Sequence, residues 1–421
     1  MTKTRLNFKV ENSTNRSQSS VRVTASQFPR FKVDSLGPRD LDAVAADLLD
    51  IAASVFLIER NLPGKQHVNR AVKITAEIGL RAPSVWSPRA IAALQELLLF
   101  MGWTHWEFSF SKLEKYKMPL VVSRGADEFE KVSLFSGGLD SLCGAATERD
   151  NDGNRLVSYY SKQKVLQRDL ASELGMTAPV QWSTYKSSFS GRGTNYFYRS
   201  FMFLSLAAVT ARSYGASRIQ QFENGILASG IPPSLADRST KHAHYRVHRL
   251  CETIFSEVLG GDWQISNPFE QTTKREAFNS MVNKLGKSQA NNLAKHAQSC
   301  WHLNAGFKLN GQIKANNLPC GFCVPCIVRQ TAHPLNTWRD LRTDNVRNHQ
   351  IHGRNFREFY ITLYDVQMAK DKSLHDFYLA LGSQAHDAIK PCGAYHLTEL
   401  KDLFSRFADE FMSTFKVGIN K

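Results

Sequence analysis

A short run with two glycines, two serines and an aspartate is the most specific chemical motif in this sequence. The run reads Ser136-Gly137-Gly138-Leu139-Asp140-Ser141. It follows an apolar, strand-like stretch at 132–135 and precedes a helix-like stretch at 142–149. Glycines allow a tight turn and a close approach to a ligand, and the N–H groups at a helix start favour an anion. The run therefore predicts a phosphate cradle, with hydroxyl donors from Ser136 and Ser141. Asp140 is placed to cap the helix or to help hold Mg²⁺.

Two neighbouring glycines alone would predict only an ordinary strand-to-helix turn, because such turns are common. The whole string in this setting predicts more. It is not the Walker lysine loop, since no Lys follows the glycines. It resembles the PP-loop of the ATP pyrophosphatases, which split ATP between the α and β phosphates, adenylate a carbonyl oxygen and release pyrophosphate.

Four of the seven cysteines form a second chemical group. Cys320, Cys323 and Cys326 lie in two overlapping C-x2-C steps, and Cys300 lies upstream. In a reducing cytosol this spacing favours a metal over disulfides. Four thiolates on a knuckle shaped by Gly321 and Pro325 predict a tetrahedral S4 shell for a structural Zn²⁺. A redox pair and a chance cluster are the alternatives, and His302 or His333 is near enough in sequence to replace one ligand.

The composition sets broad limits. A length of 421 residues predicts two or three domains, and 42% hydrophobic with 22% charged residues is typical of soluble globular proteins. The net charge of +15 fits an anionic partner such as ATP or nucleic acid. The charge is spread along the chain, however, so a merely basic surface explains it equally well.

No secretory signal is visible at the start, and the longest apolar stretch, near 97–103, is too short to span a bilayer. We therefore expect a cytoplasmic protein with no membrane partner. The isolated cysteines are expected to be buried apolar residues: Cys143, Cys251 and Cys392.

Three regions differ in their predicted elements. Residues 1–125 predict a small α+β module, with strands at 6–10, 21–25, 71–78 and 105–110 and helices at 41–62 and 89–102. Residues 336–421 predict a helical extension, with helices at 355–369, 374–381 and 397–415. We expect the first module to pack, to dock a partner or to form a dimer.

The middle region, residues 126–335, alternates strand and helix before the knuckle at 300–326. The strands are expected at 132–135, 155–160, 179–185, 218–222 and 263–267, and the helices at 142–149, 165–174, 196–214, 245–259 and 274–285. This rhythm predicts an α/β fold, a doubly wound and mostly parallel sheet with helices on both faces. Ligands of such sheets lie beyond the carboxyl ends of the strands, which is where the glycine run falls.

A PP-loop followed by a four-cysteine knuckle resembles the 7-cyano-7-deazaguanine synthase family, the QueC-like enzymes, over about residues 130–335. Further pieces of this sequence fall in the family's order. Tyr160-Ser161-Lys162-Gln163 resembles its Tyr-Gly-Gln piece, Gly191-Arg192-Gly193-Thr194-Asn195 its Gly-Arg-Asn turn, and Glu223-Asn224-Gly225 its strand-end turn near the substrate. Asn267-Pro268-Phe269 with Thr273-Lys274-Arg275-Glu276 resembles its Pro…Thr-Lys-x-Glu segment, and Ser299-Cys300 with residues 320–329 its metal knuckle and trailing arginine.

The resemblance implies an adenine-nucleotide α-hydrolase (PP-loop) fold with a zinc knuckle, using ATP, Mg²⁺ and Zn²⁺. The family adenylates 7-carboxy-7-deazaguanine, lets ammonia displace AMP to give an amide, and converts the amide to a nitrile by a second adenylation. Contacts to the nucleotide are implied for Phe135, Ser136, Gly137, Gly138, Leu139, Asp140, Ser141, Leu142, Cys143, Gly144, Ala145, Tyr160, Glu223, Asn224, Gly225, Thr273 and Lys274. Catalytic roles are implied for Asp140, Ser141, Lys274 and Arg192, of which the two cations would counter phosphate charge; the alternative for each cation is a surface position.

The sequence also departs from the small synthases. The gap between Cys300 and Cys320 is long, and the first 125 and last 85 or so residues have no counterpart there. A chain with these additional N-terminal and C-terminal regions resembles the QueC-like proteins of bacterial anti-phage defence clusters, including the QatC component of the Qat system. It implies protein partners from the same cluster and leaves the acceptor open among ammonia, a protein amine and a nucleic-acid amine. The alternatives are another PP-loop enzyme of tRNA modification, either a 7-cyano-7-deazaguanine synthase of the queuosine pathway or a tRNA-thiolating or tRNA-amidating type, and a non-catalytic nucleotide-binding subunit of a complex. Thiolation would need a free cysteine pair, whereas the paired cysteines are expected to bind metal.

A basic, histidine-rich segment at 237–249 has two interpretations. It is either a solvated loop and helix start or a lid over an anionic substrate or an acidic partner. His242 and His244 are not expected to bind metal, because no carboxylate pattern accompanies them.

Overall fold

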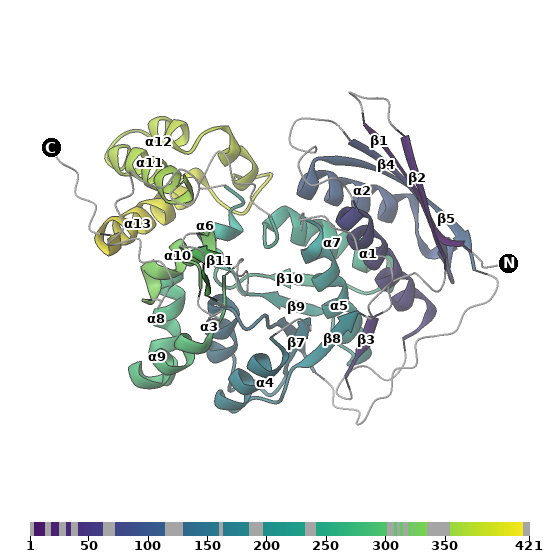
Figure 1. Cartoon of the computed structure of the whole chain (residues 1–421), viewed down its shortest axis with the longest axis horizontal. Helices are drawn as coiled ribbons and strands as arrows, with labels where there is room; N and C mark the ends of the chain where they lie inside the picture. Colours follow the sequence, from purple (N-terminus) through teal and green to yellow (C-terminus); the bar gives the residue numbers. More distant parts are fainter. Residues whose placement is uncertain are drawn as a thin grey trace.

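The computed structural model describes residues 4–12, 18–24, 31–34, 41–61, 72–113, 129–159, 163–184, 197–231, 241–300, 307–309, 312–314, 319–321, 323–334 and 354–415. They form a mixed α/β structure with parallel-rich sheets and a helical C-terminal region (Figure 1). The predictions for Tyr160, Arg192 and His302 lie outside the described residues. Among the helices that are described, none has the length and apolar character needed to cross a membrane.

The first part of the chain forms a four-stranded sheet in the order β2-β1-β4-β5. Its strands are β1 (Thr4–Asn12), β2 (Gln18–Thr24), β4 (Val72–Leu80) and β5 (Thr104–Lys112). The strand β1 is antiparallel to both neighbours, whereas β4 and β5 are parallel. A parallel pair needs a crossover, which η1 (Pro83–Val85) and α2 (Pro88–Gly102) supply. The predicted strands and helices of this region are present, including α1 (Ala43–Asn61).

A six-stranded sheet in the order β10-β9-β6-β7-β8-β3 forms the centre of the molecule. Its strands are β3 (Phe31–Val33), β6 (Lys131–Leu134), β7 (Asn154–Tyr159), β8 (Val180–Thr184), β9 (Arg218–Gln221) and β10 (Gln264–Ser266). All pairs are parallel except β3 with β8. The mostly parallel sheet is therefore confirmed, and β3 is an addition that the sequence did not predict. The chain runs from β6 outward to β8 and then returns to place β9 on the other side of β6, so the strand order reverses between β6 and β9.

Helices cover both faces of this sheet (Figure 1). The helices of this region are α3 (Leu139–Thr147), α4 (Lys164–Glu173), α5 (Arg199–Ser213), α6 (Gly225–Ala228), α7 (Tyr245–Leu259), α8 (Lys274–Leu285), α9 (Lys287–His296) and α10 (Val324–Ala332). One buried cluster joins α1, α2, α5 and α7 to the sheet, and another joins α3, α4, α8 and α9. The prediction of helices on both faces is thus confirmed. The helix α3 begins three residues earlier than predicted, at Leu139, because Gly138 is the extended N-cap.

The C-terminal region is helical, as predicted. It contains α11 (Arg354–Met368), α12 (Leu374–Leu381), η3 (Ser383–Ala388) and α13 (Leu397–Phe415). The helix α13 buries Phe404, Phe407, Phe411 and Phe415, whose spacing of three and four residues gives one apolar face. A third buried cluster joins these helices to α6, α10 and the cysteines. Between Cys300 and Cys320 the described residues include a two-stranded hairpin, β11 (Phe307–Leu309) with β12 (Gln312–Lys314).

Candidate functional site

The glycine run makes the tight turn that its sequence predicts. Gly137 has a φ of +81°, a left-handed conformation that favours glycine. Gly138 is extended, and the first helical bond runs from the Leu142 N–H group to the Gly138 carbonyl at 3.0 Å. The N–H groups of the three residues between them therefore have no acceptor inside α3. They lie at the carboxyl end of β6, on the side of the sheet where ligands of such folds bind.

Side chains of the run brace its own backbone. The Ser136 hydroxyl accepts a bond of 3.2 Å from the Gly138 N–H group and lies 3.1 Å from the Ser141 hydroxyl. Ser141 donates to the Gly138 carbonyl at 3.1 Å, and the Gln167 amide of α4 donates to the Ser136 carbonyl at 3.1 Å. These hydrogen bonds fix the backbone conformation of the turn.

Four residues predicted from three separate motifs meet beside this turn: Asp140, Glu223, Asn224 and Lys274, here called the polar cluster. Lys274, which is 1% exposed, pairs with the Asp140 carboxylate. The Asn224 amide donates to Glu223 at 2.8 Å and to Asp140 at 3.4 Å. Because β6 and β9 are parallel neighbours, the residues that follow them reach the same edge of the sheet. Of the two roles predicted for Asp140, the helix cap is wrong, since its side chain pairs with Lys274 and α3 has no side-chain cap.

The two carboxyl groups of the polar cluster influence each other strongly. Burial raises the pKa of Asp140 to about 7, and the Glu223 charge adds to this against the attraction of Lys274. Burial also acts to raise the pKa of Glu223, but the hydrogen bond and charge of His242 and the charge of Lys274 outweigh it, so its pKa is lowered. Such a pair titrates as a unit and gives up its protons in two separated steps. Lys274 stays charged, because both carboxylates raise its pKa against the effect of burial.

The segment before α8 fixes the position of Lys274. The Asn267 side chain accepts from the Glu223 N–H group at 3.2 Å and donates to the Glu223 carbonyl at 2.8 Å. Thr273 and Glu276 form a capping box, in which each side chain accepts the other residue's N–H group. The family-like pieces around residues 223 and 273 are therefore joined by hydrogen bonds. The alternative of a surface position for Lys274 is wrong.

One histidine of the basic segment contacts the polar cluster. The His242 ring nitrogen Nε2 lies 2.7 Å from the Glu223 carboxylate. Lys241, His244 and His248 are buried, so the interpretation of a solvated loop is wrong for them. Lys241 pairs with Asp387 of the C-terminal region at 2.8 Å. The described part of the segment thus packs between the sheet and the C-terminal helices.

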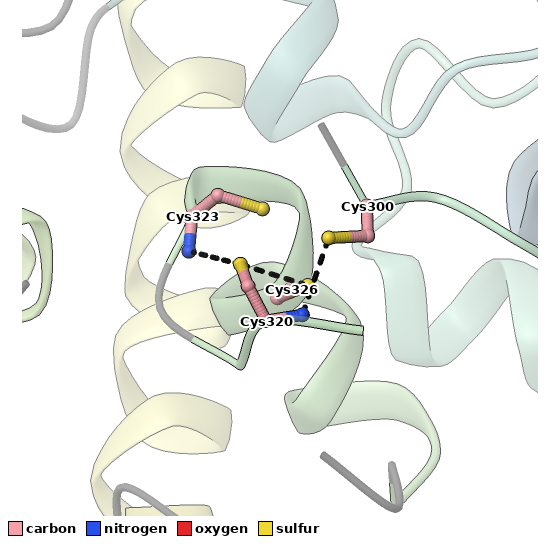
Figure 2. A group of neighbouring side chains, drawn as sticks. All are labelled: Cys300, Cys320, Cys323 and Cys326. Atoms are coloured by element: carbon pink, nitrogen blue, oxygen red, sulfur yellow. Dashed lines mark hydrogen bonds between the residues drawn. The ribbon is translucent and has the colours of Figure 1, made fainter. Parts of the chain in front are cut away.

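The four cysteines come together as predicted (Figure 2). All four sulfur atoms lie within 4.8 Å of one another, and those of Cys320 and Cys326 are 3.9 Å apart. A tetrahedral zinc site with bonds of about 2.3 Å has sulfur atoms about 3.8 Å apart. Backbone N–H groups also point at the sulfurs: Cys320 donates to Cys300 at 3.2 Å and Cys323 to Cys320 at 3.3 Å. The donor set and spacing therefore fit a metal ion such as Zn²⁺.

Gly321 and Pro325 have the backbone positions predicted for them in the cysteine knuckle. Gly321 has a φ of +84°, and Pro325 lies in the first turn of α10, where its missing N–H group costs nothing. Hydrogen bonds from the neighbouring thiols lower the pKa of Cys300, while those of Cys300 and Cys320 raise the pKa of Cys326. His333 packs against the Phe278 ring at the end of α10 instead of joining the four sulfurs.

The remaining predicted residues fall into two groups. The side chains of several are buried in the core behind the turn and serve packing: Phe135, Leu139, Leu142, Cys143 and Ala145. A Cβ at Gly144 would lie 2.1 Å from the Phe222 ring, and one at Gly225 would lie 2.1 Å from the Glu270 carbonyl, so both glycines serve close packing. Cys143 and Cys251 are buried as expected, whereas the expectation for Cys392 is wrong because it is only half-buried in a turn of the C-terminal region.

The sequence matches no model of a known protein family, and a search of curated proteins finds no match.

Proposed function

We propose that this chain is a QueC-like PP-loop enzyme that adenylates a 7-deazaguanine carboxylate with ATP, releases pyrophosphate and passes the activated acyl group to an amine. The observation that carries the proposal is the meeting of the glycine turn with the polar cluster where the strand order reverses between β6 and β9. In open α/β sheets this reversal is the place where ligands bind.

The residues around the turn suit the triphosphate of ATP. The N–H groups in the first turn of α3 are donors for phosphate oxygens, and the helix dipole favours negative charge there. Asp140 and Glu223 supply carboxylate oxygens, which Mg²⁺ prefers as ligands together with phosphate. We assign the Mg²⁺ ion to these two carboxylates and phosphate neutralisation to Lys274, which the Asp140 pair already orients.

Adenylation of a carboxylate needs a site that binds the triphosphate in this way. A carboxylate is a poor electrophile, because its charge repels a nucleophile and oxide is not a workable leaving group. Adenylation turns it into a mixed anhydride, from which AMP departs readily. Donors that face the departing pyrophosphate stabilise the charge that grows on it. The cysteine cluster would hold its metal as a structural ion, since four thiolates leave no coordination position for water.

The wider context is part of the proposal. The long build resembles the QueC-like proteins of anti-phage defence clusters, so we propose that the enzyme acts with protein partners encoded beside it. The acceptor is then ammonia, an amine of a partner protein or an amine of nucleic acid. Mass spectrometry of the co-expressed neighbouring proteins tests the second of these acceptors, since capture by a protein adds the mass of the acyl group, whereas unmodified masses throughout would count against it.

The activity can be tested directly. The full-length, zinc-loaded protein is mixed with ATP, Mg²⁺ and 7-carboxy-7-deazaguanine, and released pyrophosphate is measured. We expect release from the wild type and a loss of at least about 100-fold in Asp140→Asn, which keeps the shape of the side chain. Asp150→Asn is the matched control, because Asp150 is an exposed acid beyond the end of α3. No pyrophosphate from wild type under any of these conditions would refute the proposal.

A further inference from the structure

Two residues join the cysteine cluster to the glycine turn. The Gln298 N–H group donates to the Gly137 carbonyl at 2.9 Å. The hydroxyl of Ser299, 160 residues along the chain from its partner, accepts the Leu139 N–H group at 3.2 Å. Cys300, the next residue, is one of the four clustered cysteines. The residue that contacts the turn, Ser299, is therefore bonded directly to a residue of the metal site, Cys300.

Ser299 lies beside the N–H groups of the turn that would bind an anion. Its oxygen is 3.5 Å from the point that a Cβ at Gly138 would occupy, so it faces the glycine that leaves this space open. It uses one lone pair of the hydroxyl to accept from the first N–H group of α3. A serine hydroxyl also has one proton to donate, and a phosphate oxygen beside Leu139 would be its natural acceptor.

The cysteine knuckle holds this segment at both ends. At one end Cys300 accepts a hydrogen bond of 3.2 Å from the Cys320 N–H group. At the other end Arg329, which lies on α10 just after Cys326 and is 1% exposed, donates to the carbonyls of Ala294 and Ala297. A shift of the knuckle would therefore move Ser299 away from the turn.

We propose that Ser299 is a phosphate-binding residue and that metal occupancy of the cysteine cluster sets the affinity for the nucleotide by holding Ser299 over the turn. This rests on the proposed function for the identity of the ligand. When the metal leaves, Cys300 is released, the bond between Ser299 and Leu139 opens, and the cradle loses a donor. Metal loading then acts as a permissive signal for nucleotide binding, although the metal itself touches no phosphate.

Binding measurements test the role of Ser299. Isothermal titration calorimetry of the zinc-loaded, full-length protein uses Mg²⁺ and α,β-methylene-ATP, whose α–β link cannot be cleaved. We expect Ser299→Ala to weaken binding about tenfold, the loss of one hydrogen bond to a charged group. Ser299→Thr keeps a hydroxyl and should restore most of the affinity. Ser288→Ala, an exposed serine at the start of α9, should bind as the wild type does.

A second measurement needs no nucleotide. Hydrogen–deuterium exchange at residues 136–141 is compared in the zinc-loaded protein, in the chelator-treated protein and in zinc-loaded Ser299→Ala. We expect faster exchange at Leu139 in both altered forms. If Ser299→Ala binds the analogue as tightly as the wild type, or Leu139 exchanges at the same rate in all three forms, the inference is wrong. Absence of nucleotide binding by the wild type, with the exchange differences present, would instead defeat the proposed function and leave the link between metal and turn standing.

Discussion

The hydroxyl of Thr273, at the N-cap of α8, donates a hydrogen bond of 2.7 Å to the carboxylate of Glu410 on α13. Thr273 directly precedes Lys274, so this bond connects the polar cluster to the C-terminal helices. Arg275 strengthens the connection by donating to Thr414 at 2.8 Å. Burial raises the pKa of Glu410 to about 7, against the effect of the Thr273 bond and of the Arg275 charge. The C-terminal region is thus part of the framework that positions the candidate site.

Replacing the Thr273 hydroxyl should destabilise the protein measurably. Thr273→Ala removes both the cap of α8 and the bond to Glu410, and we expect the free energy of unfolding to fall by about 1–2 kcal/mol. Thr273→Ser keeps both bonds and should lose much less. Urea denaturation at constant pH gives both values. An equal loss in the two variants would mean that the Thr273 methyl group matters and the hydrogen bonds do not.

The pair of Asp140 and Lys274 should behave as one unit. Lys274→Met leaves the Asp140 carboxyl buried without its cation, and we expect a loss of about 3–5 kcal/mol in the free energy of unfolding. Asp140→Asn with Lys274→Met removes both charges at similar volume and should recover a large part of that loss. Denaturation of the wild type, both single variants and the double variant forms the required cycle. Additive effects would contradict the coupling, and pyrophosphate release should be absent from the double variant even where stability returns.

The cysteine cluster should hold one zinc ion per chain. Elemental analysis of purified protein should find about one zinc in the wild type and much less in Cys320→Ser, because three thiolates and a hydroxyl bind zinc weakly. Cys392→Ser, which changes a half-buried cysteine outside the cluster, should keep its zinc. A chelator should lower the melting temperature of the wild type. Full zinc content in Cys320→Ser would show that the cluster is not the binding site.

Buried His248 should make the protein sensitive to acid. Burial and the nearby Arg249 charge lower its pKa to about 3, and its ring lies 3.1 Å from the Gln221 side chain. The neutral ring therefore stabilises the fold fully above the unfolded pKa of about 6.5, and this contribution is lost as the pH falls toward 3. At pH 5 the loss is about 2 kcal/mol.

Replacing His248 separates its contribution to the pH dependence of stability from that of the other titrating groups. We expect the free energy of unfolding of His248→Gln to fall less between pH 7.5 and pH 5 than that of the wild type, by about 2 kcal/mol. His105→Gln, on the exposed side of β5, is the control and should follow the wild-type profile. Identical profiles for all three proteins would show that His248 titrates normally.

The sequence predicts those parts of the fold that depend on local pattern. The residues of β6 and β7 are largely buried, as expected for central strands of a parallel sheet, and the glycines of the turn and the C-x2-C steps require particular backbone shapes. The short strand β3 is different, because only its pairing with β8, far along the chain, makes it a strand. The single turn of α6 is likewise too short to give a periodic signal.

The candidate site was predictable only in pieces. Residue types and the family-like order identify Asp140, Glu223 and Lys274, but nothing local shows that they touch. For Lys241 the local sequence is misleading, because a lysine in a basic segment is expected in solvent. In the structure its ammonium group pairs with Asp387 and lies 3.9 Å from the centroid of the Phe100 ring. These partners come from distant parts of the chain, and only the folded protein brings them together.

The strand β3 closes one side of the six-stranded sheet, with Phe31 set edge-on against Trp182 of β8. An uncovered β8 would offer a row of unpaired amide and carbonyl groups to any other extended peptide. The short strand β3, which precedes β8 in the sequence, therefore covers the edge that β8 would otherwise expose. Loss of the β3 pairing should therefore favour association between copies of the chain through the open edge of β8.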